Sequence, residues 1–129
     1  MYYRGVWITD TYFTGHIHQV ETTLRRSIAQ IVRAGSGYVR LYIGIASGHD
    51  HWTALANRVD QKKKDAKVST MYLLYRSSSL ANTTELERRL VNHFREIFTE
   101  DALWNSTGGG GGRRGAGPNF YVYLAVSEE

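Results

Sequence analysis

Glu87 is the residue whose position in this sequence points most directly to chemistry. Residues 84–98 carry apolar side chains at helical spacing, and at about 100° per residue Glu87 falls inside the same arc. The apolar members of that arc are Leu86, Leu90, Val91, Phe94, Ile97 and Phe98. A carboxylate that faces a protein interior is costly unless a specific partner holds it. The spacing therefore predicts an inward-facing carboxylate, and it favours a metal-dependent enzyme.

The same spacing also allows a purely structural role for Glu87. Thr84 followed by Glu87 matches a capping box, in which the glutamate side chain accepts a hydrogen bond from the backbone N–H of the cap residue. Both interpretations predict a helix that starts at Thr84. They differ in what the loss of the carboxylate would do: a lost cap costs about 1 kcal/mol of stability, whereas a lost metal ligand abolishes activity and leaves the fold intact.

Alternating strands and helices must position this residue. Runs of aromatic and β-branched residues predict strands, and apolar residues at helical spacing predict helices. The predicted strands are residues 2–9, 38–45, 68–75 and 120–126, and the predicted helices are residues 20–34, a segment that Asp50 caps, and residues 84–98. This order predicts an α/β (α+β) fold, in which a small central mixed β-sheet is flanked by about three helices.

The composition limits the classes of protein to which the chain can belong. Its 129 residues suit a single domain, 1–129. Cysteine is absent, which excludes disulfides, thiolate metal sites and a cysteine nucleophile, and which fits an intracellular setting. Because the sequence contains no run of about 18 apolar residues, we expect a soluble protein that does not contact membranes.

The charge of the chain favours a polyanionic partner. Sixteen Lys and Arg residues against twelve Asp and Glu residues give a net charge of +4. The candidate nucleic-acid contacts are Lys62, Lys63, Arg113 and Arg114. The two lysines also suit the solvated end of the second predicted helix, where cations complement the helix dipole. The two arginines follow five glycines in a glycine-rich loop, residues 106–118, for which a flexible connector without a specific role is the alternative.

The triplet Tyr42-Ile43-Gly44 ends the second predicted strand, and together with the residues that follow it resembles the GIY-YIG nuclease superfamily. The family pattern runs from a strand ending in Tyr-Ile-Gly to a helix with an arginine, a further strand, a helix with a glutamate and then an asparagine. The positions that match this order are Tyr42, Arg58, Glu87 and Asn105. The resemblance spans roughly residues 38–105, and Glu87 stands out by helical geometry alone.

The resemblance implies a GIY-YIG-like fold and a Mg²⁺-dependent endonuclease that hydrolyses phosphodiester bonds in DNA, with RNA as an open alternative. Glu87 would hold the single Mg²⁺, and Arg58 would contact the scissile phosphate and stabilise the pentavalent transition state. Tyr42 would orient or deprotonate the attacking water, and Asn105 would help to hold the shape of the site. His51, or alternatively His49, would help to relay a proton, an addition that the family permits and does not require. A dimer that pairs two cuts is compatible with this function, and the oligomeric state stays open.

The chain departs from the family pattern at the first motif, Gly-Ile-Tyr. The nearest match is Gly5-Val6-Trp7 on the first predicted strand, and a tryptophan cannot act as a base. The catalytic tyrosine would then be Tyr42, or one of Tyr2, Tyr3 and Tyr38. This departure supports a second class of function, a noncatalytic nucleic-acid- or protein-binding module that retains the nuclease fold.

The matched positions also have ordinary structural interpretations. Tyr42 suits a strand aromatic with its hydroxyl at the surface, Arg58 a solvated helix residue and Asn105 a turn residue. A competing zinc site would use two closely spaced histidine pairs, His16 with His18 and His49 with His51. Loop histidines without cysteine or carboxylate partners are more often ordinary polar residues.

Overall fold

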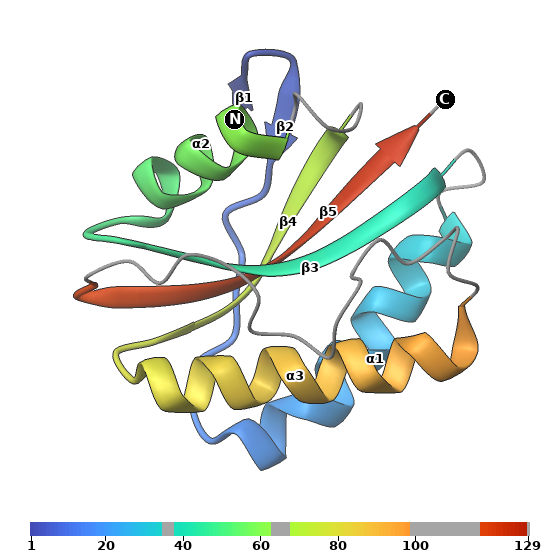
Figure 1. Cartoon of the computed structure of the whole chain (residues 1–129), viewed down its shortest axis with the longest axis vertical. Helices are drawn as coiled ribbons and strands as arrows, with labels where there is room; N and C mark the ends of the chain where they lie inside the picture. Colours follow the sequence, from blue (N-terminus) through green and yellow to red (C-terminus); the bar gives the residue numbers. More distant parts are fainter. Residues whose placement is uncertain (35–37, 63–67, 99–116, 129) are drawn as a thin grey trace.

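The computed structural model describes residues 1–34, 38–62, 68–98 and 117–128. Within these ranges, three helices pack against one five-stranded sheet (Figure 1). The strands are β1 (Tyr2–Tyr3), β2 (Val6–Ile8), β3 (Tyr38–Gly48), β4 (Val68–Ser77) and β5 (Asn119–Glu128). The helices are α1 (Ile17–Ala34), α2 (His51–Lys62) and α3 (Leu80–Ile97). The predicted fold class is confirmed, because the fold is α+β with a mixed sheet.

The last strand of the sequence occupies an interior position in the sheet. The strand order is β1-β2-β4-β5-β3, and β5 pairs antiparallel with both β4 and β3. The short strand β2 runs parallel to β4, and β1 pairs antiparallel with β2. Pairing between β3 and β5 extends from Tyr38 opposite Glu128 to Gly48 opposite Asn119. The last strand of the sequence, β5, is therefore the one that joins β3 to β4 in the sheet.

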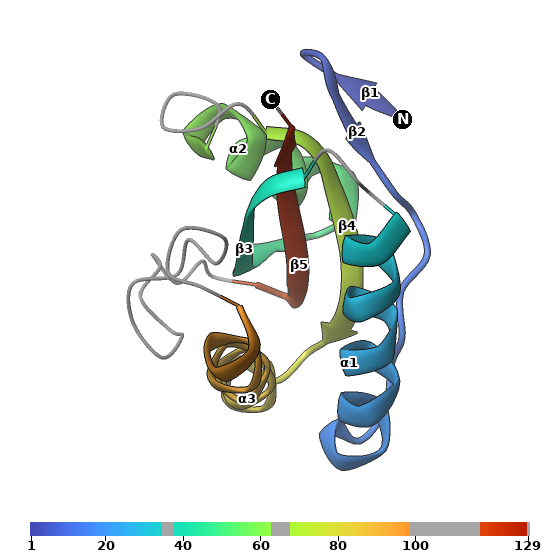
Figure 2. The same ribbon diagram turned by 90° about the vertical axis from the view of Figure 1, so that its right-hand side faces the viewer.

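Alternate residues of β5 divide the core into two parts, as a strand buried on both faces requires. The residues toward α2 are Tyr121, Tyr123 and Ala125, and those toward α1 and α3 are Val122, Leu124 and Val126. Figures 1 and 2 show α1 and α3 on one side of the sheet and α2 on the other. Side chains at neighbouring positions of β5 thus belong to different environments.

Two of the three predicted helices form where the apolar spacing places them. Helix α1 buries Val20, Leu24 and Ile28 against the sheet. Helix α2 begins directly after Asp50, whose carboxylate accepts a hydrogen bond from the backbone N–H of Thr53 at 2.8 Å and so caps the helix as predicted. None of the helices in the described ranges combines the length and the apolar character needed to cross a membrane.

The predicted strand at residues 2–9 is instead a tight hairpin. Arg4 and Gly5 join β1 to β2 with φ angles of 49° and 84°, and Tyr2 pairs with Trp7. Two consecutive residues in the left-handed region turn the chain back on itself, and glycine adopts this region without a steric penalty. The prediction of one continuous strand was wrong, because Gly5 introduces a turn into an otherwise strand-like run.

Helix α3 starts four residues before the predicted position and has a different cap. The hydroxyl of Ser79, the N-cap, accepts a hydrogen bond from the backbone N–H of Asn82 at 3.2 Å. Ser is a good N-cap, and the earlier start adds a turn of helical hydrogen bonds. Thr84 therefore lies inside the helix, and the capping-box interpretation of Glu87 is wrong. The predicted inward orientation is confirmed, because Glu87 is only 3% exposed.

Candidate active site

Two tyrosine rings approach each other over Gly44. Gly44 on β3 lies opposite Tyr123 on β5, and the ring centroids of Tyr42 and Tyr123 are 6.3 Å apart. A Cβ atom at Gly44 would lie 2.5 Å from Tyr123 Oη and 2.7 Å from Tyr42 Cε1. Side chains in a close-packed interior do not tolerate contacts this short. The glycine of the triplet is therefore required by packing, and it lets the hydroxyl end of Tyr123 approach the Tyr42 ring.

Arg58 reaches back from α2 to the strand that carries the triplet. Its Nε donates a hydrogen bond to the backbone carbonyl oxygen of Ile45 at 2.9 Å. The side chain is half-buried, and about two turns of helix separate it from the start of α2. The hydrogen bond holds the guanidinium at β3, one residue beyond Gly44. The alternative that Arg58 is an ordinary solvated helix residue is therefore wrong.

Glu87 adds a buried negative charge to the same neighbourhood. Burial raises the pKa of Tyr42, the Glu87 carboxylate raises it further, and the Arg58 guanidinium lowers it. Burial also raises the pKa of Tyr123, with smaller contributions from Tyr42, Arg58 and Glu87. Tyr42, Tyr123 and Arg58 lie on the α2 side of the sheet, whereas α3 packs against the other side, so the link between Glu87 and the two tyrosines is electrostatic. We call these four residues, Tyr42, Arg58, Glu87 and Tyr123, the tyrosine–glutamate site.

Tyr123 is a residue of this site that sequence reasoning did not select. The alternation along β5 predicts that Tyr121 and Tyr123 share one face, and this pattern was the available signal. The pattern does not say which strand lies beside β5. Pairing between β3 and β5 joins distant parts of the sequence and leaves no local signature. Only the folded structure places Tyr123 against Tyr42.

The proposed match to the first family motif lies elsewhere in the fold. Trp7 is on β2, and both β4 and β5 separate β2 from β3. Trp7 is 41% exposed and packs edge-on against Tyr2, with 4.8 Å between the ring centroids. The expectation that Gly5-Val6-Trp7 takes the place of the first motif beside the triplet is therefore wrong. The tyrosine that adjoins Tyr42 across the sheet is Tyr123.

His51 lies in a different group of side chains. It is the first residue of α2, and its ring is 4.2 Å from the ring of Trp52, 6.0 Å from that of Tyr12 and 6.4 Å from that of Tyr121. Tyr121 precedes Tyr123 by two residues on the same face of β5. The His51 group is therefore a neighbour of the tyrosine–glutamate site along the sheet, and the role of His51 in proton relay stays a prediction.

Most of the predicted nucleic-acid contacts lie outside the described ranges. The residues wholly outside them are Lys63, Asn105, Arg113 and Arg114. Lys62 is the last residue of α2, and its side chain is not among those described. Of the glycine-rich loop, only Gly117 and Pro118 are described. The roles assigned to these residues therefore stay predictions.

The donor set of the tyrosine–glutamate site fits a Mg²⁺ ion held by one carboxylate. Mg²⁺ in enzymes keeps several of its waters and binds through one or two carboxylates together with substrate phosphates. Glu87 supplies one such carboxylate. Tyr42 and Tyr123 carry protonated hydroxyls at neutral pH, as ordinary phenols do, and such hydroxyls are suitable hydrogen-bond partners for ordered water. The residues present are therefore compatible with Mg²⁺ bound mainly through water and substrate.

The alternative zinc site does not form within the described ranges. No three His, Asp or Glu side chains in those ranges gather into a group that could hold a metal ion. The rings of His16 and His18 stack on each other at 4.9 Å at the start of α1. His51 instead packs beside Trp52. The two histidine pairs of the sequence are therefore separate features of the fold.

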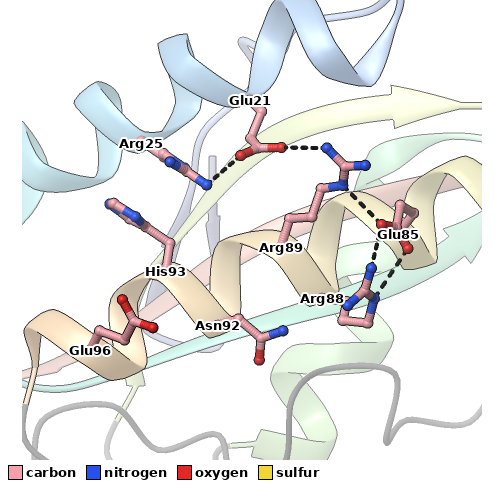
Figure 3. A pocket seen from close by; sticks show the side chains of 8 residues that line it. All are labelled: Glu21, Arg25, Glu85, Arg88, Arg89, Asn92, His93 and Glu96. Carbon is pink, nitrogen blue, oxygen red and sulfur yellow. Dashed lines mark hydrogen bonds and ion pairs between the residues drawn. The ribbon is translucent and has the colours of Figure 1, made fainter.

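The outer faces of α1 and α3 enclose a hollow of about 460 Å³, whose charged walls pair with each other (Figure 3). Its lining residues are Glu21, Arg25, Glu85, Arg88, Arg89, Asn92, His93 and Glu96. Arg89 joins the two helices, because it contacts Glu85 at 2.8 Å and Glu21 at 3.2 Å. Arg88 also pairs with Glu85, and Arg25 pairs with Glu21. This ion-pair hollow links α1 to α3 and is not the candidate active site.

Comparison with known proteins does not assign the chain to a family. No family model, no curated protein and no solved structure matches it. The case for a function therefore depends on the residues of the tyrosine–glutamate site, their burial and their mutual contacts.

Proposed function

We propose that this protein is a Mg²⁺-dependent endonuclease that hydrolyses phosphodiester bonds in DNA. The observation that carries the proposal is Glu87, a carboxylate that is 3% exposed on the apolar face of α3, does not cap its helix and acts electrostatically on Tyr42. A carboxylate in this position can ligate a divalent cation, and a cation bound there would add to the interactions that hold the carboxylate in the interior. The net charge of +4 and the resemblance of residues 38–105 to the GIY-YIG nucleases support the same function.

Arg58 is the residue that we assign to the scissile phosphate. The hydrogen bond from its Nε to Ile45 restricts the guanidinium before any substrate arrives. A restricted guanidinium loses little conformational freedom when it contacts a phosphate, and its charge stabilises the additional negative charge of the transition state. Mg²⁺ bound at Glu87 would supply charge neutralisation at the same phosphate and at the leaving oxygen.

Tyr42 is the residue that we assign to the attacking water. Its hydroxyl is a hydrogen-bond donor beside Arg58 and Glu87, whose charges act on it, and in the proposed enzyme it orients the water by hydrogen bonding. In the reaction the water oxygen bonds to phosphorus, the bond from phosphorus to one ester oxygen breaks, a proton of the water passes to solvent, and the leaving oxygen takes up a proton from solvent to become a hydroxyl. Tyr123 supports this geometry, because its ring packs against the Tyr42 ring over Gly44.

A noncatalytic binding module that retains the nuclease fold is the second candidate. The observation in its favour is Trp7, which in the sequence stands where the family pattern has the first-motif tyrosine, cannot act as a base and lies on β2, away from Tyr42. Such a module would bind nucleic acid or a protein through the basic surface and would not require a divalent cation. Cleavage measurements distinguish the two candidates.

Plasmid cleavage with purified protein tests the proposed function. We expect nicking in the presence of Mg²⁺ and none in EDTA. Glu87→Gln and Arg58→Ala should both lose activity while they melt as cooperatively as the unaltered protein. Glu96→Gln is a matched control, because Glu96 is exposed on the same helix and undergoes the same chemical change. This control should cleave normally.

Two results would contradict the proposal. Cleavage that persists in EDTA would show that Glu87 does not serve as the ligand of an essential metal. Absence of cleavage by the unaltered protein, with both DNA and RNA substrates and with Mg²⁺ present, would reject the nuclease. If the protein nevertheless binds those nucleic acids tightly, the binding module becomes the assignment.

A further inference from the structure

A second group of polar and aromatic side chains shares the sheet face of Tyr42 and Tyr123. We call it the Arg76 cluster, and its members are Tyr12, His51, Arg76 and Tyr121. Arg76 on β4 lies directly opposite Tyr121 on β5, so their side chains project from the same face of the sheet. Tyr121 and Tyr123 belong to the same core cluster. The two sites are therefore neighbours along β5.

Backbone hydrogen bonds hold Tyr12 next to Arg76. The segment between β2 and α1 runs along β4, where Phe13 N donates to Leu74 O at 2.9 Å and Phe13 O accepts from Arg76 N at 3.0 Å. The Arg76 guanidinium carbon lies 5.7 Å from the centroid of the Tyr12 ring. The His51 ring lies 6.0 Å from the same centroid. Tyr12 thus adjoins the nitrogen-bearing side chains of both α2 and β4.

Arg76 is a half-buried cation without a counter-ion in the described part of the chain. It makes no ion pair there, and its Nε is buried without a hydrogen-bond partner. Asp50, whose charge reaches Tyr121, is engaged at the start of α2, where it accepts hydrogen bonds from the backbone N–H and the hydroxyl of Thr53. A desolvated guanidinium without a partner is costly, and its planar fork matches the oxygens of a phosphate.

His51 provides a second nitrogen that lacks a partner. Its Nε2 is buried, and no group in the described ranges forms a hydrogen bond with it. Buried polar atoms without partners are uncommon, and an ion or ligand is one established reason for them. The Tyr12 ring, which adjoins both nitrogen-bearing side chains, is 37% exposed. A change of rotamer at a surface side chain is fast, so in the proposed binding mode Tyr12 moves aside to admit a ligand to the two nitrogens.

We propose that the Arg76 cluster binds a phosphate of the nucleic-acid strand close to the scissile phosphodiester. Arg76 and His51 act as donors, and the Tyr12 ring offers a stacking surface for the adjacent base. This inference rests on the proposed nuclease function, which locates the scissile group at the tyrosine–glutamate site. Two residues of β5 span about 7 Å, which is close to the distance between successive phosphorus atoms of one strand. The bound phosphate is therefore about one nucleotide from the cut.

Binding of oligothymidylates of increasing length, measured by fluorescence anisotropy in EDTA, tests this inference without cleavage. In the unaltered protein, the affinity should rise in a step at the length that first reaches both sites. Arg76→Gln should remove this step. It should weaken binding of longer strands about tenfold and leave the shortest strands unaffected. The slope of log Kd against log salt concentration should fall by about 0.7 for the longer strands.

Two further variants separate a phosphate contact from other effects of the substitution. Arg26→Gln removes one positive charge from an exposed position of α1, and it should retain the step. Arg76→Lys keeps the charge and should restore part of the step, which loss of packing against Tyr12 would not explain. Melting curves confirm that each variant is folded. Equal weakening at all lengths, no weakening, or the same effect from Arg26→Gln would overturn the inference.

Failure of the nuclease proposal would give a different pattern. A protein that cleaves nothing but shows the Arg76-dependent step has the phosphate site and lacks the proposed activity. A protein that cleaves plasmid in Mg²⁺ and shows no such step has the activity and lacks the phosphate site. In an active protein, Arg76→Gln should raise KM and leave kcat nearly unchanged, because Arg76 contacts the strand away from the reacting phosphorus.

Discussion

Glu85 and Glu87 are two residues apart on α3, yet they lie in opposite environments. Glu85 is part of the ion-pair hollow, where hydrogen bonds from Arg88 and then Arg89 lower its pKa to about 2. Glu87 is 3% exposed and raises the pKa of Tyr42. Residue type is the same in both cases. Their positions relative to the apolar stripe of the helix differ. Glu85 lies outside the stripe and forms ion pairs, whereas Glu87 lies inside it and is the candidate metal ligand.

The two regions also differ in how their charges are compensated. In the ion-pair hollow, arginines of α1 and α3 neutralise the carboxylates in contact with solvent (Figure 3). Exposed pairs of this kind contribute little to stability. In the tyrosine–glutamate site, burial is the leading cause of the raised pKa values of Tyr42 and Tyr123. Equivalent substitutions should therefore have large effects in the site and small effects in the hollow.

The largest expected difference concerns cleavage. Glu87→Gln should lower the rate of plasmid nicking in Mg²⁺ at least about a hundredfold, because an amide is a poor substitute for the carboxylate ligand of a catalytic metal. Glu85→Gln should retain the rate within about twofold, since its exposed ion pairs contribute little. Initial rates for the two variants provide the measurement. A similar loss in both would show that the difference in burial has no functional meaning.

The next largest difference concerns packing around Gly44. Gly44→Ala should destabilise the protein by about 1–3 kcal/mol, as expected for an overpacked core, since its Cβ would lie 2.5 Å from Tyr123 Oη. Gly48→Ala on the same strand should change stability by less than about 0.5 kcal/mol, because its Cβ would lie 3.5 Å from that of Ala54. Urea unfolding measures both. Equal stabilities would mean that the two rings do not meet over Gly44.

High pH should remove stability that the buried Tyr123 of the tyrosine–glutamate site contributes. The pKa of Tyr123 is raised above its ordinary value of 10.0, chiefly by burial. The unfolded chain therefore loses this proton first, and the stability present below about pH 10 is lost as the pH rises further. The Tm advantage of the unaltered protein over Tyr123→Phe should consequently shrink between about pH 9 and pH 11. A constant difference would argue against a buried, protonated Tyr123.

Low pH should remove the stability that the ion-pair hollow contributes, and this is the smallest of the four predicted effects. The lowered pKa of Glu85 means that its contribution to stability is present above about 4.5, the ordinary value, and is lost as the pH falls toward about 2. The Tm advantage of the unaltered protein over Glu85→Gln should therefore disappear over this interval. It should also decrease at high salt, because the pairs are accessible to solvent. A Tm difference that is insensitive to both would show that the hollow is not stabilised by charge.

Two errors in interpreting the sequence have a common origin. The start of α3 was predicted at Thr84, although Ser79 caps the helix, and residues 2–9 were predicted as one strand, although Arg4 and Gly5 form a turn. In both cases the apolar pattern was correct and the boundary was not. Caps and turns depend on one or two residues, whose signal is weaker than the periodicity of a whole segment.

The sequence by itself determined the order of the three helices and of the last three strands, the two faces of β5 and the inward orientation of Glu87. These features follow from periods of 3.6 and 2 residues, which are local properties of the chain. Only the tertiary structure decided that Tyr123 approaches Tyr42 over Gly44, that Trp7 is remote from both, and that Arg76 lies beside Tyr12. These contacts depend on pairing between segments far apart in the sequence, which becomes favourable only once the intervening chain is folded.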